Sequence, residues 1–129
     1  MKAAQDHISE IKARLATSAI VATVDIVAER ITEYRGYFRA RMSLTNGDFL
    51  EVSEYFIIQA GQPSTVEYRY QWMDDARQKL VKRWDNAEHY PDMPNFPHHI
   101  HVGDEKQVVP GQLLGIIALL DIIEQDIGK

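Results

Sequence analysis

Residues 2–16 follow the pattern of an amphipathic helix, and the residues after them change to an alternation of period two. Ile8, Ile11 and Leu15 recur at spacings of three and four, which places them on one helical face. From Ala19 onward, apolar and polar side chains alternate as they do in strands that bury one side. This alternation predicts strands at residues 19–29, 37–44, 49–59, 65–73 and 80–84.

Short turns separate the predicted strands. Asn46-Gly47 lies between two of them and favours a type I′ hairpin turn, because both residue types tolerate positive φ. Asp74-Asp75 begins another polar turn. Strands joined by such short connections pair in chain order, so the sequence predicts an antiparallel meander without crossover helices.

The chain becomes irregular after Asp85, where four of its five prolines fall. Proline cannot donate to a neighbouring strand, so this stretch is expected to be a loop or at most a sheet edge, with a short sixth strand at 108–109. Residues 112–127 predict a helix that is apolar on more than one side and could form a homodimer contact. We therefore predict a single α+β domain, residues 1–129: an antiparallel meander of five or six strands, with an N-terminal and a C-terminal helix on one face and the other face free for a ligand.

The composition narrows the class of protein. The 129 residues contain no cysteine, which excludes disulfides, thiol nucleophiles, zinc–thiolate sites and iron–sulfur sites. The segment from Met1 to Arg14 is charged throughout and lacks the apolar core of a signal peptide. The longest apolar run, 113–120, is shorter than the roughly 18 residues of a membrane helix. We expect a cytoplasmic protein without membrane contact.

The formal charge of −5 argues against a protein whose whole surface binds nucleic acid. The charge is unevenly distributed, with a net −1 in residues 1–29, +2 in 30–83 and −6 in 84–129. Four arginines of the predicted sheet are candidates for holding the phosphates of a nucleic acid: Arg39, Arg41, Arg69 and Arg83. The alternative is a solvated face with cross-strand ion pairs to Glu51 and Glu67.

Histidine is concentrated in one segment, since four of the five histidines lie within residues 89–101. Histidine changes charge near neutral pH, so its clustering beside Asp85 and Glu88 suggests acid–base chemistry or metal ligation. If residues 98–101 are extended, His99 and His101 point to one side and His98 to the other. The candidate catalytic residues are Asp85, His89, His98, His99 and His101.

Three interpretations of this segment remain open. His99 and His101 could chelate a metal, with Asp85 or His89 as the third ligand. They could instead act as general base and general acid in RNA cleavage, which requires no metal or other cofactor. The third interpretation is structural, with the side chains bonding to the backbone of an irregular loop.

Aromatic side chains and the remaining histidine fit structural roles. Trp84 and Phe96 are expected to be packing anchors, and the alternating residues Tyr68, Tyr70 and Trp72 are expected to face the core. His7 lies on the N-terminal helix, away from the other histidines, and is expected at the surface.

Two motifs occur at a characteristic spacing: Arg83-Trp84-Asp85-Asn86-Ala87 with His89, and Phe96-Pro97-His98-His99-Ile100-His101-Val102-Gly103, preceded by Tyr70-Gln71-Trp72. Through them the chain, from about residue 20 to its C-terminus, resembles the TumE-type toxins of prokaryotic type II toxin–antitoxin modules. Members of that family tend to have Pro and His where this chain has Glu88 and Tyr90, which leaves His98, His99 and His101 as the stronger catalytic candidates.

The resemblance implies a small α+β protein, encoded beside a DNA-binding antitoxin that neutralises it, and acting on RNA or the translation apparatus. Our leading hypothesis from the sequence is a metal-independent ribonuclease that uses histidine chemistry, without a cofactor. The alternative is a non-enzymatic module that binds nucleic acid or protein, in which the histidine-rich segment is a recognition element. The expected partners are the cognate antitoxin, RNA or the ribosome, and a second copy of the chain through the C-terminal helix.

Overall fold

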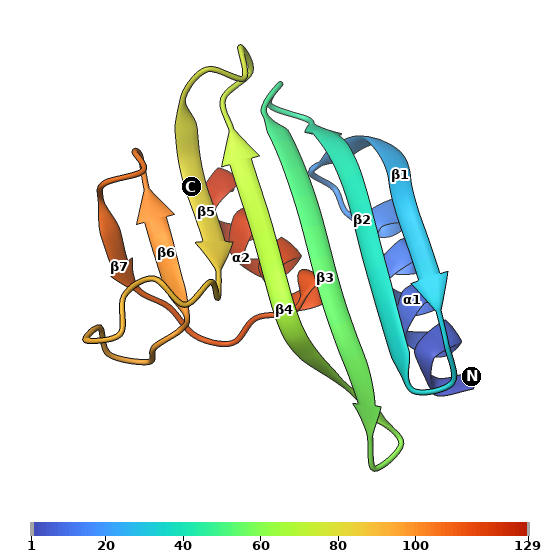
Figure 1. Ribbon diagram of the computed structural model, residues 1–129. Coiled ribbons are helices and arrows are strands. Elements are labelled where there is room, and N and C mark those ends of the chain that lie inside the picture. Colours follow the sequence, from blue (N-terminus) through green and yellow to red (C-terminus); the bar gives the residue numbers. More distant parts are fainter. Residues whose placement is uncertain (1, 129) are drawn as a thin grey trace.

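A computed structural model describes residues 2–128. Seven antiparallel strands form one open sheet in chain order, with a helix at each end of the chain (Figure 1). The elements are α1 (Lys2–Thr17), β1 (Val21–Ile31), β2 (Arg35–Leu44), β3 (Phe49–Gln59), β4 (Gln62–Met73), β5 (Leu80–Asp85), β6 (His99–Val102), β7 (Val108–Pro110) and α2 (Ile116–Ile127). The α+β meander predicted from the sequence is confirmed.

The number of strands is higher than the five or six predicted, because β6 forms within the segment expected to be a loop. His99–Val102 pairs with β5 on one side and with β7 on the other. The strand fits between Pro97 and Pro110, where every residue has a backbone N–H to donate. Four residues are too few to give a readable alternation, so the sequence pattern does not reveal this strand.

Both helices cover the same face of the sheet, as predicted (Figure 1). The alternation places one side of β2, β3 and β4 against them, including Phe38, Leu50 and Tyr70. Helix α2 begins at Ile116 rather than near 112, and contributes Ile116, Leu119, Leu120 and Ile123 to the core. Packing on the sheet accounts for much of its wide apolar surface, and a homodimer through this helix stays a prediction.

Strand β1 differs from the prediction, because its alternation does not produce a buried side. Val24, Ile26 and Val27 are each at least 40% exposed. The strand is at the edge of the sheet, and its register with β2 is interrupted twice, so the helices cover only part of it. The opposite face of the central strands carries no helix, and we call it the open face (Figure 1).

A buried carboxylate links both helices to the sheet. Glu54 of β3 is 0% exposed and accepts a hydrogen bond from the backbone N–H of Ile116, at the start of α2. Its other oxygen lies 2.8 Å from Nε2 of His7 on α1. The expectation that His7 lies at the surface is therefore wrong, because its ring packs on Phe56 and pairs with Glu54.

Gly36 on β2 makes room for an aromatic ring of β3. It pairs across the strands with Phe56, and a Cβ at position 36 would lie 2.1 Å from Cζ of that ring. We expect Gly36→Ala to destabilise the fold by about 1–3 kcal/mol in urea denaturation, through overpacking. Combining it with Phe56→Leu should cost less than the sum of the two single changes. Additive losses would show that the ring is not what excludes a side chain here.

An ion-pair network joins the two helices and predicts an acid dependence of stability. Arg14 donates hydrogen bonds to Glu124 and Asp121, and Ser18 also bonds to Glu124. The hydrogen bond from Arg14, followed by that from Ser18, lowers the pKa of Glu124. A depressed carboxyl pKa stabilises the fold above the unfolded pKa, and this contribution is lost as the pH falls through the folded pKa.

Arg14→Gln should therefore lower the free energy of unfolding at neutral pH by up to about 1 kcal/mol. The difference from wild type should shrink as the pH falls through the lowered folded-state pKa of Glu124, where this carboxyl becomes protonated. Urea denaturation at a series of pH values measures this difference. A gap that stays constant down to the acid limit would contradict the proposed linkage.

Candidate functional site

The strand register places the predicted site residues in two rows across the open face. In the first row Arg39 of β2 is opposite Ser53, Ser53 opposite Arg69, Arg69 opposite Asp85, and Asp85 opposite His99. Directly paired residues project from the same side of a sheet. The row therefore brings two arginines, a carboxylate and an imidazole onto the face that carries no helix.

The second row runs beside the first and ends at the other histidine of β6. Arg41 is opposite Glu51, Glu51 opposite Gln71, Gln71 opposite Arg83, and Arg83 opposite His101. All four arginines predicted to hold phosphate thus lie on one face. These rows place residues from β2, β4, β5 and β6 on one face, although up to about 60 positions separate them in the sequence.

Asp85, His99 and His101 form a compact cluster at the β5–β6 end of these rows. Their exposed fractions are 6%, 2% and 3%. Nε2 of His99 lies 3.0 Å from Oδ1 of Asp85, and Nε2 of His101 lies 3.6 Å from Oδ2. The two imidazole rings are 5.0 Å apart between centroids. One carboxylate therefore lies beside both imidazoles.

Backbone carbonyls set the orientation of both rings. Nδ1 of His99 is 2.9 Å from the carbonyl oxygen of Pro97, and Nδ1 of His101 is 2.9 Å from that of Glu105. A carbonyl oxygen only accepts hydrogen bonds, so each Nδ1 donates. In the neutral rings, both Nε2 atoms consequently carry a lone pair directed at the cluster.

The two Nε2 atoms differ in their partners. Nε2 of His101 lies 3.2 Å from Nη2 of Arg83, which can donate to it. Nε2 of His99 is the one buried side-chain polar atom of residues 2–128 that has no hydrogen-bond partner. Its 3.0 Å approach to Asp85 lacks the alignment of a hydrogen bond.

Arg83 is held beside the cluster by a second carboxylate. Its guanidinium donates to both oxygens of Glu105, at 2.6 and 2.9 Å, and Nε lies 3.3 Å from Oδ2 of Asp85. The hydrogen bonds to Glu105 raise the pKa of Arg83 above its ordinary value, so its positive charge is fixed. The sequence pattern does not reveal this role of Glu105, because the residue lies in the β6–β7 turn, 22 positions after Arg83.

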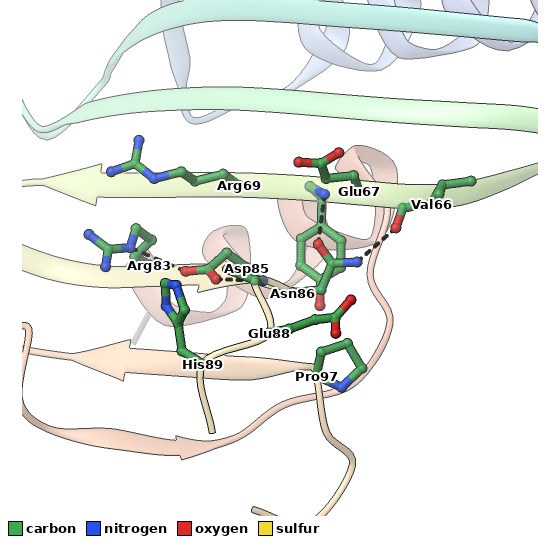
Figure 2. Close-up of a pocket in the computed structure, with 11 residues that line it drawn as sticks. Val66, Glu67, Arg69, Arg83, Asp85, Asn86, Glu88, His89 and Pro97 are labelled. Atoms are coloured by element: carbon green, nitrogen blue, oxygen red, sulfur yellow. Dashed lines mark hydrogen bonds and ion pairs between the residues drawn. The ribbon is translucent and has the colours of Figure 1, made fainter. Parts of the chain in front are cut away.

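A cleft of about 670 Å³ opens beside Asp85, between β4 and the segment that follows β5 (Figure 2). Asn86 forms one wall, because its amide accepts from the N–H of Tyr68 and donates to the carbonyl of Val66. The His89 ring points toward Asp85 and Arg83 (Figure 2). The lining residues are Val66, Glu67, Tyr68, Arg69, Arg83, Asp85, Asn86, Ala87, Glu88, His89 and Pro97.

The predicted residues His89 and His98 are in different places. His89 is exposed, with its ring 6.5 Å from that of His99, so it belongs to the rim of the site. His98 points away from the cluster, as expected because successive side chains of an extended segment alternate between its two sides. Its Nδ1 pairs with the hydroxyl of Tyr68 at 2.9 Å, and burial lowers its pKa.

Aromatic residues near the site follow the predictions only in part. Trp84 is buried and packs in the core, as do Tyr68, Tyr70 and Trp72. Phe96 is 39% exposed, so the expectation that it anchors the packing is wrong: it lies in the turns before β6, outside the sheet. Tyr90, named in the sequence only as a departure from the family's pattern, has its ring edge-on to His99 at 5.0 Å between centroids.

Arg39 and Arg41 share a single carboxylate on the open face. Arg39 lies 2.6 Å and Arg41 3.4 Å from Oε2 of Glu51. The ion-pair alternative considered for these arginines is therefore present in the structure. Asp25 of β1 is also opposite Arg41 in the strand register, so two carboxylates project beside the two guanidinium groups of this part of the face.

The fold and the site define an α+β protein with an open antiparallel sheet and a buried histidine–carboxylate cluster on the side of the sheet opposite the helices. The family model described as "Toxin TumE" matches residues 11–129, which is most of the chain. The protein therefore belongs to the TumE toxin family, and is the toxin component of a toxin–antitoxin module with an antitoxin as its partner. No curated protein and no solved structure matches the chain. Neither described helix is long and apolar enough to cross a membrane.

Proposed function

We propose that this toxin acts on RNA through the open face of its sheet, with the Asp85–His99–His101 cluster as the chemical centre. The observation that carries the proposal is the pair of rows that aligns four arginines with this cluster. Arginine is suited to phosphate because its guanidinium offers several donors in a planar array. A row from β2 to β6 spans roughly 19 Å at the usual spacing between strands, enough for a few nucleotides of single-stranded RNA.

Arg69 is the arginine best placed to contact RNA at the cleft. It lines the cleft, is exposed, and donates a hydrogen bond to the neutral side chain of Gln71. Arg83 lines the same cleft but is held by Glu105 and Asp85. We therefore assign Arg69 to phosphate binding and Arg83 to holding the cluster in place.

The cluster can support cleavage in two ways. An imidazole whose Nδ1 is fixed by a carbonyl presents Nε2 as a base, which can take a proton from a 2′-hydroxyl. The same arrangement of Nε2 atoms around a carboxylate can hold a metal ion that activates water. In both cases the substrate would approach the cluster from the side of Asp85, because this residue lines the cleft.

A second candidate function is favoured by the burial of the histidines. His99 and His101 are only 2% and 3% exposed, and Tyr90 packs against His99. A buried cluster can also be a structural support for a surface that binds RNA without cutting it. In that case the arginines would carry the toxicity and the histidines would contribute only stability.

Purified protein mixed with fluorescent single-stranded RNA separates these functions. We expect saturable binding that weakens with salt, because phosphate contacts release counterions. Arg69→Gln should weaken binding by at least several-fold, whereas Lys12→Gln, an equal change of charge on the helical side, should not. Gel analysis of the same mixtures shows whether the RNA is cut. Binding without cutting would favour the second function, and the absence of binding would contradict both.

A further inference from the structure

We propose that Asp85, His99 and His101 bind a divalent transition-metal ion of the zinc type. This inference concerns the cluster of the proposed function, and rests on that function only for what the ion would do to RNA. Metal binding itself can be measured without any RNA. The observation that carries it is Nε2 of His99, a buried nitrogen without a hydrogen-bond partner that lies 3.0 Å from a carboxylate oxygen of Asp85.

The neutral cluster is electrostatically incomplete. Each Nδ1 donates to a backbone carbonyl, so Nε2 of neutral His99 carries a lone pair and lies only 3.0 Å from a carboxylate oxygen. Two electron-rich atoms at this distance repel each other unless a positive charge lies between them. A proton on Nε2 would need an aligned hydrogen bond to Asp85, which the geometry does not provide. A bound cation satisfies both atoms at once.

The donor atoms match the requirements of zinc. The ligating atoms of the three residues all lie within 4.8 Å of one another. Ligands around a tetrahedral zinc lie about 3.3 Å apart. Each imidazole has a carboxylate oxygen of Asp85 at a similar distance, Oδ1 at 3.0 Å from His99 and Oδ2 at 3.6 Å from His101. Two imidazoles and one carboxylate form the three-ligand set that leaves a further position for water or substrate.

The surroundings of the histidines also fit metal ligands. Metal-binding histidines usually donate their second ring N–H to a carbonyl or carboxylate, which fixes the ring for the ion. Pro97 and Glu105 supply those carbonyls here. Arg83 would release Nε2 of His101 to the ion while keeping its two hydrogen bonds to Glu105.

The charge of the cleft gives the ion a second role. Three carboxylates line the cleft, from Glu67, Asp85 and Glu88, against the guanidinium groups of Arg69 and Arg83. With neutral histidines the lining has a net charge of −1, which repels phosphate. A divalent ion would change this to +1. The ion would therefore let RNA phosphate approach Asp85, which lines the cleft and belongs to the cluster.

Isothermal titration of tag-free, chelator-treated protein with Zn²⁺ tests the proposal. We expect one Zn²⁺ per chain, no comparable binding of Mg²⁺, which prefers oxygen ligands, and absorption bands of nitrogen–oxygen-coordinated Co²⁺. His99→Gln and Asp85→Asn should each weaken Zn²⁺ binding at least 100-fold. The matched control is His98→Gln, which removes the neighbouring imidazole on the opposite side and should leave binding unchanged.

Two controls distinguish a loss of metal binding from a loss of folding. Circular dichroism of each metal-free variant shows whether it folds, and the stoichiometry and Co²⁺ spectrum of the wild-type protein do not depend on any variant. The absence of saturable binding to the wild type, or full binding by folded His99→Gln, would overturn the inference. Zn²⁺ binding without RNA binding would leave the metal site standing and remove the proposed function. RNA binding without Zn²⁺ binding would overturn the metal site and leave the proposed action on RNA standing.

Discussion

Expression of the Asp85→Asn variant is expected to leave bacterial growth nearly unaffected, whereas the wild-type toxin without its antitoxin should arrest growth. The carboxylate of Asp85 accepts a hydrogen bond from the backbone N–H of Ala87. It also lies beside His99, His101 and Arg83. Asparagine keeps the size of the side chain but removes the charge that each of these groups faces. Loss of acid–base catalysis at the cluster typically lowers a rate by a factor of about 10²–10⁴.

Colony counts after induction measure this effect, at soluble protein levels matched by immunoblot. Asp92→Asn is the control, because Asp92 is exposed in the segment after β5 and lies outside the cleft. It should remain as toxic as the wild type. If a soluble, folded Asp85→Asn variant still arrests growth, the cluster is not the functional centre.

Replacing Glu54 with leucine should have the largest effect on stability. Its carboxylate is fully buried and is contacted by His7, Thr65, Tyr70 and the N–H of Ile116. Leucine fills the volume but leaves the N–H of Ile116 and the ring nitrogen of His7 without their acceptor, whereas Tyr70 keeps its hydrogen bond to the carbonyl of Leu114. Breaking a buried ionic network in this way costs about 3–5 kcal/mol, a large part of the 5–15 kcal/mol that stabilises a typical domain.

Urea denaturation of Glu54→Leu, Glu54→Gln and Glu51→Gln measures this contribution. Glu54→Gln keeps an acceptor for Ile116 and should lose less stability than Glu54→Leu. Glu51→Gln changes a partly exposed carboxylate of the same strand on the open face, and should change stability by less than about 1 kcal/mol. Equal stability of Glu54→Leu and wild type would mean that Glu54 does not connect the helices to the sheet.

The alternation of residues predicted most of the fold, because a sheet covered by helices on one side must bury every second residue. The alternation did not predict the structure where a strand is not covered by the helices or is too short to show a period. Strand β1 lies at the sheet edge, so its apolar side chains stay exposed. Strand β6 is too short to show a period, and its surrounding prolines are typical of a loop.

The candidate site could be predicted in composition but not in arrangement. The two-residue spacing of His99 and His101 correctly placed them on one side, with His98 on the other. Their contact with Asp85 depends on the β5–β6 register, which the intervening loop conceals. The carbonyl partners at Pro97 and Glu105 belong to the backbone and leave no trace in residue type.

Sequencing of RNA 5′ ends from cells that express the toxin tests the central claim most directly, namely that the cluster on the open face acts on RNA. We predict that new RNA ends accumulate within minutes of inducing the wild-type protein, before growth stops, and that they are absent with Asp85→Asn at the same protein level. Growth arrest by the wild type with an unchanged set of RNA ends would contradict a cleavage function. New ends of equal abundance with Asp85→Asn would contradict the assignment of the site.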